Sequence, residues 1–342
     1  MIINMSGAGA PGKVVTVHVP PEAGATVTCT NGKKTLSAVT GGSCNAVFNL
    51  TKGAWSVTAQ KSGVSKTANV NVTDNCTLEL SLEQIPVFTY TGEYAIVDDS
   101  YNQIDSTLGN WKIRFLTSGT LTFTALNGAE NGIDVFLVGG GGSGANGCEQ
   151  SDGTYRDAYG GGGGYTKTVR GVRISTNTDY AITVGAGGAS ASSISQSGHN
   201  GGSTSAFGAT ANGGEGAVGF TGSSQTGHGG NGGSGGGGAG GGSGGSNGTD
   251  GSGQLHCTGQ KTTTREFGEE GGNLYSGGGG GAVNGAGGAG GGGAGCPTGS
   301  KSNGADGIAN TGGGGGAGSR QEYPSTHSGA GGSGIVIIRN KR

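Results

Sequence analysis

The sequence predicts an all-β protein in which an N-terminal β-sandwich precedes a β-rich, glycine-rich domain containing packed polyglycine II helices. Three observations predict this. Short segments rich in Val, Thr and aromatic residues alternate with a period of two before Val138. Glycine accounts for 86 of 342 residues, with 14 in residues 1–138 and 72 in residues 139–334. Strand-like segments also recur between the glycine runs, which favours an ordered domain over a linker.

Composition and charge exclude several classes of protein. No segment approaches the ~18 apolar residues of a membrane-spanning helix. The first six residues lack the basic region and apolar core of a secretory signal. A net charge of -2 without a Lys/Arg cluster argues against nucleic-acid binding. The chain has six Pro and no strict Gly-X-Y period, so it is not collagen, and its many Gly disfavour long helices.

Residues 1–12 are expected to form an N-terminal arm, and residues 13–85 a β-sandwich. Turn signals at roughly 8–12-residue spacing separate about seven short strands. Asn31-Gly32 lies between two β-type segments, which is a strong hairpin signal. The main strand-like segments are residues 14–19, 25–29, 44–50, 55–59, 65–72 and 76–82.

The sequence Gly53-Ala54-Trp55-Ser56-Val57-Thr58-Ala59-Gln60-Lys61-Ser62-Gly63 resembles carboxypeptidase-regulatory-like and PEGA-type Ig-like modules. In those modules the aromatic position is often Tyr, and here it is Trp55. The resemblance covers about 70 residues. It implies an Ig-like sandwich that acts as a spacer or docking unit and carries no catalytic residues.

Residues 86–342 form the second expected domain, which begins at the linker residue Pro86. Strands are expected at residues 87–90, 111–115, 120–123, 133–138, 165–174, 180–184 and 334–339. Three structures compete for the glycine runs between them: a disordered linker, a silk-like matrix, and an ordered polyglycine II lattice. Repeats such as His228-Gly-Gly, Asn231-Gly-Gly and Ser234-Gly-Gly match three residues per turn, so we favour the lattice. Neighbouring helices would then satisfy the buried N–H and C=O groups, and the one side chain per turn would point to the edge of the bundle.

The order of several blocks resembles the glycine-rich domain of phage tail and fibre proteins. These blocks are residues 133–142, 160–169, 180–188, 202–208, 211–214 and 331–339. The resemblance implies polyglycine II helices joined by variable loops that contact the ligand. A related domain in the anaplastic lymphoma kinase receptor family would need a signal peptide and a membrane span. We therefore expect a virion protein, made in the host cytoplasm and released by lysis.

No catalytic, cofactor or metal site is predicted, and the chain is not expected to be an enzyme. The G-x-G-x-x-G matches lack the Lys-Ser/Thr of a phosphate loop and a surrounding βαβ unit. No C-x-x-C motif is present, and adjacent His256-Cys257 would chelate a metal poorly. Gly304-Ala305-Asp306-Gly307 resembles half of a calcium repeat but occurs only once.

The sequence leaves the cysteine pairing open. Free, buried thiols are one reading of the three N-terminal cysteines, and a bridge from Cys29 to Cys76 or Cys44 is the other. A disulfide between Cys257 and either Cys296 or Cys148 would link two of the loops between the glycine runs covalently.

Aromatic and charged side chains concentrate in three segments between the glycine runs: residues 148–159, 254–275 and 319–327. Tyr and Arg are favoured contact residues at interfaces. The candidate receptor contacts are Tyr155, Arg156, Tyr159, His256, Arg265, Phe267, Tyr275, Arg320, Tyr323 and His327. Structural cover of the lattice edge is the alternative role.

Together these observations predict a non-enzymatic tail-fibre or fibre-tip adhesin. Its expected partners are a receptor on the host cell surface, glycan or protein, and other virion proteins that bind residues 1–85. Fibre proteins are often trimeric, so a homotrimer is one expected arrangement. The alternatives are a purely structural head or tail appendage and a bacterial surface protein.

Overall fold

The chain folds from strands, turns and glycine-rich runs, and the all-β prediction is confirmed. Among the described segments, none forms a helix with the length and hydropathy needed to cross a membrane. The computed structural model describes residues 12–20, 23–61, 64–80, 82, 84–104, 110–127, 129, 132–149, 155–156, 158–193, 195–219, 227–297, 302–319 and 326–340.

The chain divides into two compact units. The first comprises Met1–Val87, Ile96–Trp111 and Ala125–Gly128, and the second comprises Phe88–Ala95, Lys112–Thr124 and Ala129–Arg342. The sequence suggested a single boundary at residues 85/86. The assignment of residues 96–111 and 125–128 to the first unit was not expected.

Two sheets make up the first unit. One has the order β4-β1-β7, and the other has the order β3-β2-β5-β6. The strands are β1 (Lys13–His18), β2 (Thr26–Thr30), β3 (Thr35–Val39), β4 (Asn45–Leu50), β5 (Gly53–Lys61), β6 (Val64–Val72) and β7 (Cys76–Glu79). The hairpin between β2 and β3 turns at Asn31-Gly32, as predicted, and Asn31 Oδ1 accepts the amide hydrogens of Lys33 and Lys34.

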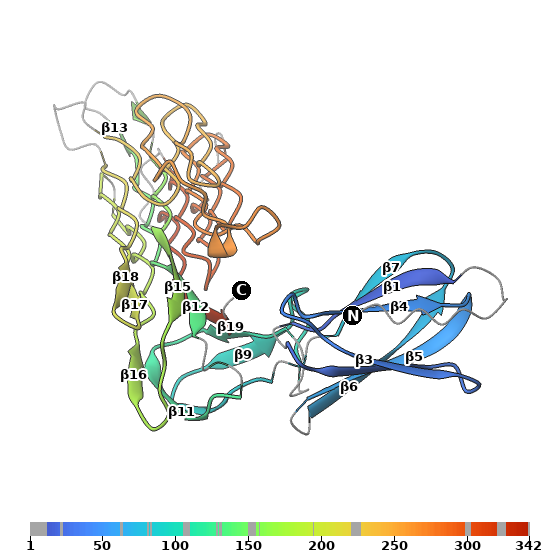
Figure 1. Ribbon diagram of the computed structural model, residues 1–342. Helices are drawn as coiled ribbons and strands as arrows, with labels where there is room; N and C mark the ends of the chain where they lie inside the picture. Colours follow the sequence, from blue (N-terminus) through green and yellow to red (C-terminus); the bar gives the residue numbers. More distant parts are fainter. Residues whose placement is uncertain are drawn as a thin grey trace. The chain divides into compact units, whose positions relative to one another are not determined.

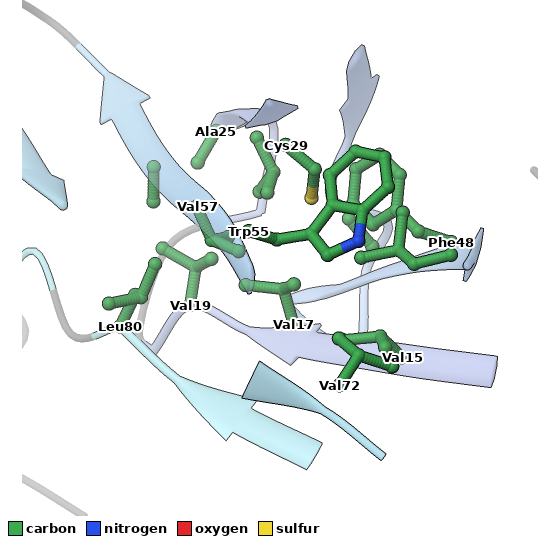
Figure 2. Packing of buried hydrophobic residues seen from close by; sticks show 14 of the residues in the cluster. Val15, Val17, Val19, Ala25, Cys29, Phe48, Trp55, Val57, Val72 and Leu80 are labelled. Carbon is green, nitrogen blue, oxygen red and sulfur yellow. The ribbon is translucent and has the colours of Figure 1, made fainter. Parts of the chain in front are cut away.

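The two sheets of the first unit enclose one apolar core, because alternate residues of each strand point inward (Figure 2). Trp55 is the largest side chain in this core, and its indole N–H donates to the carbonyl of Thr51 at 2.9 Å. Cys29 lies beside it, and burial raises the pKa of its thiol to about 12. The expected sandwich of about seven strands is therefore present, and β3 is a strand that lies outside the six segments named from the sequence.

The second unit contains a five-stranded sheet of order β15-β12-β19-β10-β9 and a three-stranded sheet of order β16-β11-β8. Strand β19, near the end of the chain, lies between β12 and β10. The strands are β8 (Val87–Tyr90), β9 (Tyr94–Val97), β10 (Lys112–Phe115), β11 (Gly119–Ala125), β12 (Ile133–Val138), β15 (Thr166–Val172), β16 (Asp179–Ile182) and β19 (Ile335–Asn340). A short hairpin joins β17 (Thr204–Ala206) to β18 (Ala209–Ala211).

Beyond β12 the backbone enters the glycine lattice, which Figure 1 draws as traces coloured from green to red. Successive N–H groups of residues 139–146 donate in turn to three neighbouring runs. Residues 139, 142 and 145 bond to residues 165, 162 and 159, while residues 140, 143 and 146 bond to residues 202, 199 and 196. Residues 141 and 144 bond to residues 332 and 329. Because each neighbour is met at every third residue, the run has three residues per turn.

The run 160–165 repeats this pattern. Its N–H groups donate at every third residue to residues 237 and 234, to 315 and 312, and to 215 and 212. Each run thus satisfies its backbone through other runs, as buried polar groups require. The predicted polyglycine II packing is confirmed by this register.

Glycine is required where the runs meet. A Cβ added to Gly142, Gly161 or Gly314 would lie less than 3.0 Å from a backbone carbonyl oxygen of a neighbouring run. At the outer surface, Ala186 and Ala189 are exposed, whereas Gly188 between them is buried. One small side chain per turn therefore faces solvent at this edge.

Candidate binding surface

The glycine lattice has two different ends. At one end it joins the sheet, where β12 leads into Gly139 and Gly334 leads into β19. We call the opposite end the distal end. Hydrogen bonds and side-chain contacts connect its described residues, which are 145–147, 158–159, 191–193, 195–196, 217–219, 227–229, 239–241, 253–257, 282–284, 296–297, 317–319 and 326–328.

At the distal end, glycine gives way to alanine. Tyr159 packs with Ala145, Ala217 and Ala239 in one small apolar cluster. A second cluster consists of Ala158, Ala282, Ala317 and Val283. At this end the runs are therefore held together by side-chain packing as well as by the backbone hydrogen bonds that join the runs elsewhere in the lattice.

The side chain of Asn146 contacts the backbone of several segments at the distal end. Its side-chain Nδ2 donates to the carbonyl oxygens of Ala191 at 3.0 Å and Ser193 at 3.1 Å, and lies 3.4 Å from that of Thr326. Asn146 is only 3% exposed. Asn146 therefore connects the described residues of three segments at this end.

A segment at the sheet side of the lattice covers one face of the sheet. We call this segment, residues 262–275, the strap; its two ends meet where the N–H of Tyr275 donates to the carbonyl of Thr264 at 3.3 Å. Phe267 and Tyr275 of the strap pack against Phe136 of β12, with ring centroids 5.8 and 5.4 Å apart. These three side chains belong to one buried cluster, so the strap completes the core of the second unit.

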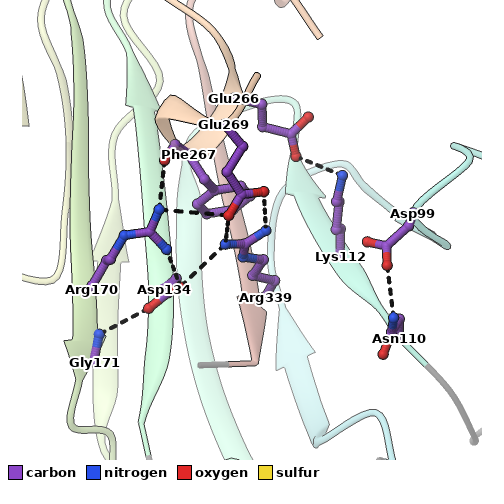
Figure 3. A network of polar contacts seen from close by, with 10 residues as sticks. All are labelled: Asp99, Asn110, Lys112, Asp134, Arg170, Gly171, Glu266, Phe267, Glu269 and Arg339. Atoms are coloured by element: carbon purple, nitrogen blue, oxygen red, sulfur yellow. Dashed lines mark hydrogen bonds and ion pairs between the residues drawn. The ribbon is translucent and has the colours of Figure 1, made fainter. Parts of the chain in front are cut away.

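An ion network also holds the strap (Figure 3). Arg339 of β19 donates from Nη1 to Glu269 Oε2 at 2.8 Å, and its Nη2 lies 3.4 Å from Asp134 Oδ2. Arg170 donates to Asp134 Oδ2 at 2.9 Å and to the carbonyl of Phe267 at 2.8 Å. The guanidinium of Arg339 also lies 4.0 Å from the ring centroid of Phe267.

The burial of its charged groups determines how much this ion network contributes to the stability of the fold. Asp134 and Arg339 are buried, so removing either charge would leave the other poorly compensated. Burial lowers the pKa of Arg339, but its hydrogen bonds to Glu269 and the charges of Glu269 and Asp134 raise that pKa more. A second buried pair joins Lys112 Nζ to Glu266 Oε1 at 3.1 Å. The network therefore ties the strap to three strands of the sheet.

The comparison with protein families agrees with this architecture. The model of a family described as a glycine-rich domain matches residues 116–341. The chain belongs to this glycine-rich domain family. No curated protein sequence matches the chain. The matched range of the glycine-rich domain contains the whole lattice, the strap and the central strand β19.

Three of the predicted contact residues of the glycine-rich domain are accessible. His256 and His327 are exposed at the distal end, and Arg265 is half-buried in the strap. His256 Nδ1 lies 2.7 Å from the carbonyl of Gly253. Because a carbonyl only accepts, Nδ1 carries the proton and Nε2 remains free of it in the neutral ring. Arg265 donates from Nη1 to the carbonyl of Gly272 at 2.8 Å, so this atom serves the strap itself.

Three other predicted contact residues of the glycine-rich domain are buried, and their assignment as surface contacts was wrong. Tyr159 is 1% exposed, Phe267 is 2% exposed and Tyr275 is 4% exposed. Tyr159 fills the distal apolar cluster, and the other two fill the core beneath the strap. Burial also raises the pKa of the Tyr275 hydroxyl. Structural cover, the alternative role, describes these three side chains.

The remaining four predicted residues of the glycine-rich domain are not tested at the level of side chains. Tyr155 and Arg156 form β14 (Tyr155–Arg156), which pairs with β13 (Cys148–Glu149), but their side chains lie outside the described structure. Arg320 and Tyr323 lie outside the described residues.

The fold of the glycine-rich domain brings Cys257 close to His228, a pairing that sequence spacing did not indicate. Cys257 Sγ lies 3.3 Å from His228 Nδ1, which is also 2.6 Å from the carbonyl of Gly229. Burial, followed by the charge of Glu215, raises the pKa of the Cys257 thiol. This is opposite to the lowered pKa of a cysteine nucleophile.

The disulfide alternatives are not present among the described side chains of the glycine-rich domain and the first unit. Cys29, Cys44, Cys76, Cys257 and Cys296 form no disulfide. The possible bridges among them are therefore absent, and Cys257 is also unbridged to Cys148. Within the described residues, no group of three or more His, Cys, Asp or Glu side chains is placed to hold a metal ion.

Proposed function

We propose that this chain is a phage virion protein, a tail-fibre or fibre-tip adhesin that recognises a bacterial cell surface through the distal end of its glycine lattice. In this proposal it acts by binding and carries out no reaction. The resemblance of its glycine blocks to phage tail and fibre proteins supports the virion assignment.

The observation that carries the proposal is the construction of the distal end. The described turns of the distal end connect runs of a lattice in which the backbone of each run is hydrogen-bonded to several neighbouring runs. His256 and His327 are exposed there, while Asn146 fixes the neighbouring segments from inside. Polar side chains held on a rigid base are suited to recognition.

Rigidity explains how such a surface would bind. Ordering of loops on binding costs free energy, and a prebuilt surface avoids much of that cost. Weak single contacts would be multiplied when several copies are displayed on one particle. The β-sandwich of the first unit would dock to other virion proteins, in keeping with its resemblance to Ig-like spacer modules.

A cell-binding assay with the fluorescently labelled full-length chain tests the proposal. The panel should include a strain infected by the phage that encodes the chain. We expect strain-selective binding by the wild type. The double variant His256→Ala/His327→Ala should bind at least about tenfold more weakly, a change of about 1.4 kcal/mol. The control His18→Ala changes an imidazole in β1 of the first unit and should bind normally.

One result would contradict the proposal, and another would contradict only the role given to the two histidines. If the folded wild-type chain does not bind the susceptible strain, a structural appendage of the head or tail becomes the better assignment, with a bacterial surface protein as the other alternative. If the wild type binds and the double variant binds equally well, these two histidines are not contacts. Recognition would then have to use other residues.

A further inference from the structure

Two aliphatic residues at the distal end adopt a left-handed backbone conformation. Leu255 has φ 57° and Val283 has φ 72°. This region is disfavoured for any residue with a Cβ, and for a β-branched residue such as Val it is a clear outlier. Glycines at neighbouring turns, such as Gly240 and Gly253, adopt positive φ without that cost.

The choice of Leu and Val is unexpected in a chain with 86 glycines. Glycine is the default residue for this conformation and is abundant in the adjoining turns. Among the described non-glycine residues with positive φ, Leu255 and Val283 are the only aliphatic ones. Strained residues of this kind cluster at sites that bind ligands.

Both residues flank a single turn. The N–H of Ala239 donates to the carbonyl of Gln254 at 2.8 Å, and the N–H of Gly241 donates to the carbonyl of Ala282 at 2.9 Å. The carbonyl of Leu255 accepts the N–H of Gly229 at 3.0 Å. The turn at residues 239–241 therefore lies between the segments that carry Leu255 and Val283, and backbone hydrogen bonds hold all three.

Leu255 and Val283 thus place one aliphatic side chain on each of the two segments that flank this turn. Leu255 is 52% exposed, which is high for a large aliphatic residue. Val283 is half-buried and packs on the alanines of the second distal cluster. The segments 239–242, 253–256 and 282–285 contain no Asp, Glu, Lys or Arg. Their polar side chains are Gln254, His256 and Asn284.

We propose that Leu255 and Val283 insert into an apolar recess of a protein on the host cell surface. This inference rests on the proposed function and names its partner. An anionic glycan or lipid phosphate would require cationic side chains, which these turns lack. A neutral glycan is usually held by exposed aromatic rings, and Tyr159, the aromatic residue of the first distal cluster, is buried. An exposed aliphatic side chain on segments without Asp, Glu, Lys or Arg matches the core of a protein interface, which is depleted in charged residues.

The test compares the full-length wild type with Leu255→Gly/Val283→Gly and with Leu255→Ser. Glycine relieves the strained φ at both positions, so the double glycine variant should unfold at the same temperature as the wild type or higher. Its binding to the susceptible strain should nevertheless fall at least about tenfold. Leu255→Ser should weaken binding in the same direction. The matched control is Ile308→Ser, since Ile308 is 61% exposed but lies on the side of the lattice, bonded to Gly291.

The outcomes separate this inference from the proposed function. If Leu255→Gly/Val283→Gly and Leu255→Ser both bind as well as the wild type and the Ile308→Ser control, the apolar contact is refuted while the adhesin function stands. If the wild type binds no strain, both fail together. Proteinase treatment of the cells should abolish binding, whereas periodate oxidation of surface glycans should leave it intact. The reverse result would overturn the protein partner and indicate a glycan.

Discussion

At the scale of single residues, the glycines inside the lattice and those outside it differ in what surrounds them. A Cβ at Gly142 would lie less than 3.0 Å from the carbonyl oxygen of Glu215 on a neighbouring run. At Gly271 in the strap, nothing lies within 4 Å of that position, and its φ is not positive. Packing therefore requires glycine at position 142 but not at position 271.

This difference predicts opposite results for two Gly→Ala substitutions. Gly142→Ala should lower the free energy of unfolding by about 3 kcal/mol, at the upper end of the cost of overpacking, because the obstruction is backbone and cannot rotate away. Gly271→Ala should change it little or raise it by about 0.4–1 kcal/mol. Chemical denaturation of the full-length variants measures both. Equal stability of the two would contradict the interlocked lattice.

At the scale of elements, the strap shows where sequence reasoning failed. Its aromatic and charged residues stand out among glycines, which suggested an exposed recognition loop. The same composition suits a segment that packs aromatic rings on a sheet and binds a buried arginine. The partners Phe136 and Arg339 lie far away in the sequence, so spacing within the strap could not indicate them.

The strap also yields a prediction about the buried ion network. Asp134→Asn should destabilise the second unit by about 3 kcal/mol, because the buried guanidinium of Arg339 would keep only Glu269 as a carboxylate partner. Asp74→Asn breaks an exposed pair with Lys13 and should have no measurable effect on thermal unfolding. A stability of Asp134→Asn equal to that of the wild type would show that the network does not hold the strap.

At the scale of the whole molecule, the division into two units affects how the chain should be studied. Residues 96–111 and 125–128 belong to the first unit although they follow its main segment. A fragment that begins at residue 86 would separate them from residues 1–87. Binding and stability are therefore best measured on the full-length chain.

The lattice predicts an unusual pattern of hydrogen exchange. Residues 139–147 contain no helix or strand, yet every N–H from residue 139 to residue 147 donates to another segment of the chain. We expect these amides to exchange as slowly as those of β12 and β19. Hydrogen–deuterium exchange with mass spectrometry measures this directly. Complete exchange of this run at the earliest time point would favour the disordered-linker alternative.

The sequence by itself determined the features that depend on local backbone geometry. Alternation with a period of two located the strands, and glycine recurring in a period of three indicated a helix with three residues per turn. Only the tertiary structure decided which of the conspicuous side chains face solvent. Arg339 and Asp134 are 205 residues apart yet meet beneath the strap, and the buried Tyr159 and the exposed Leu255 both lie at the distal end. Burial and strain of this kind arise from contacts between distant runs, so no local pattern records them.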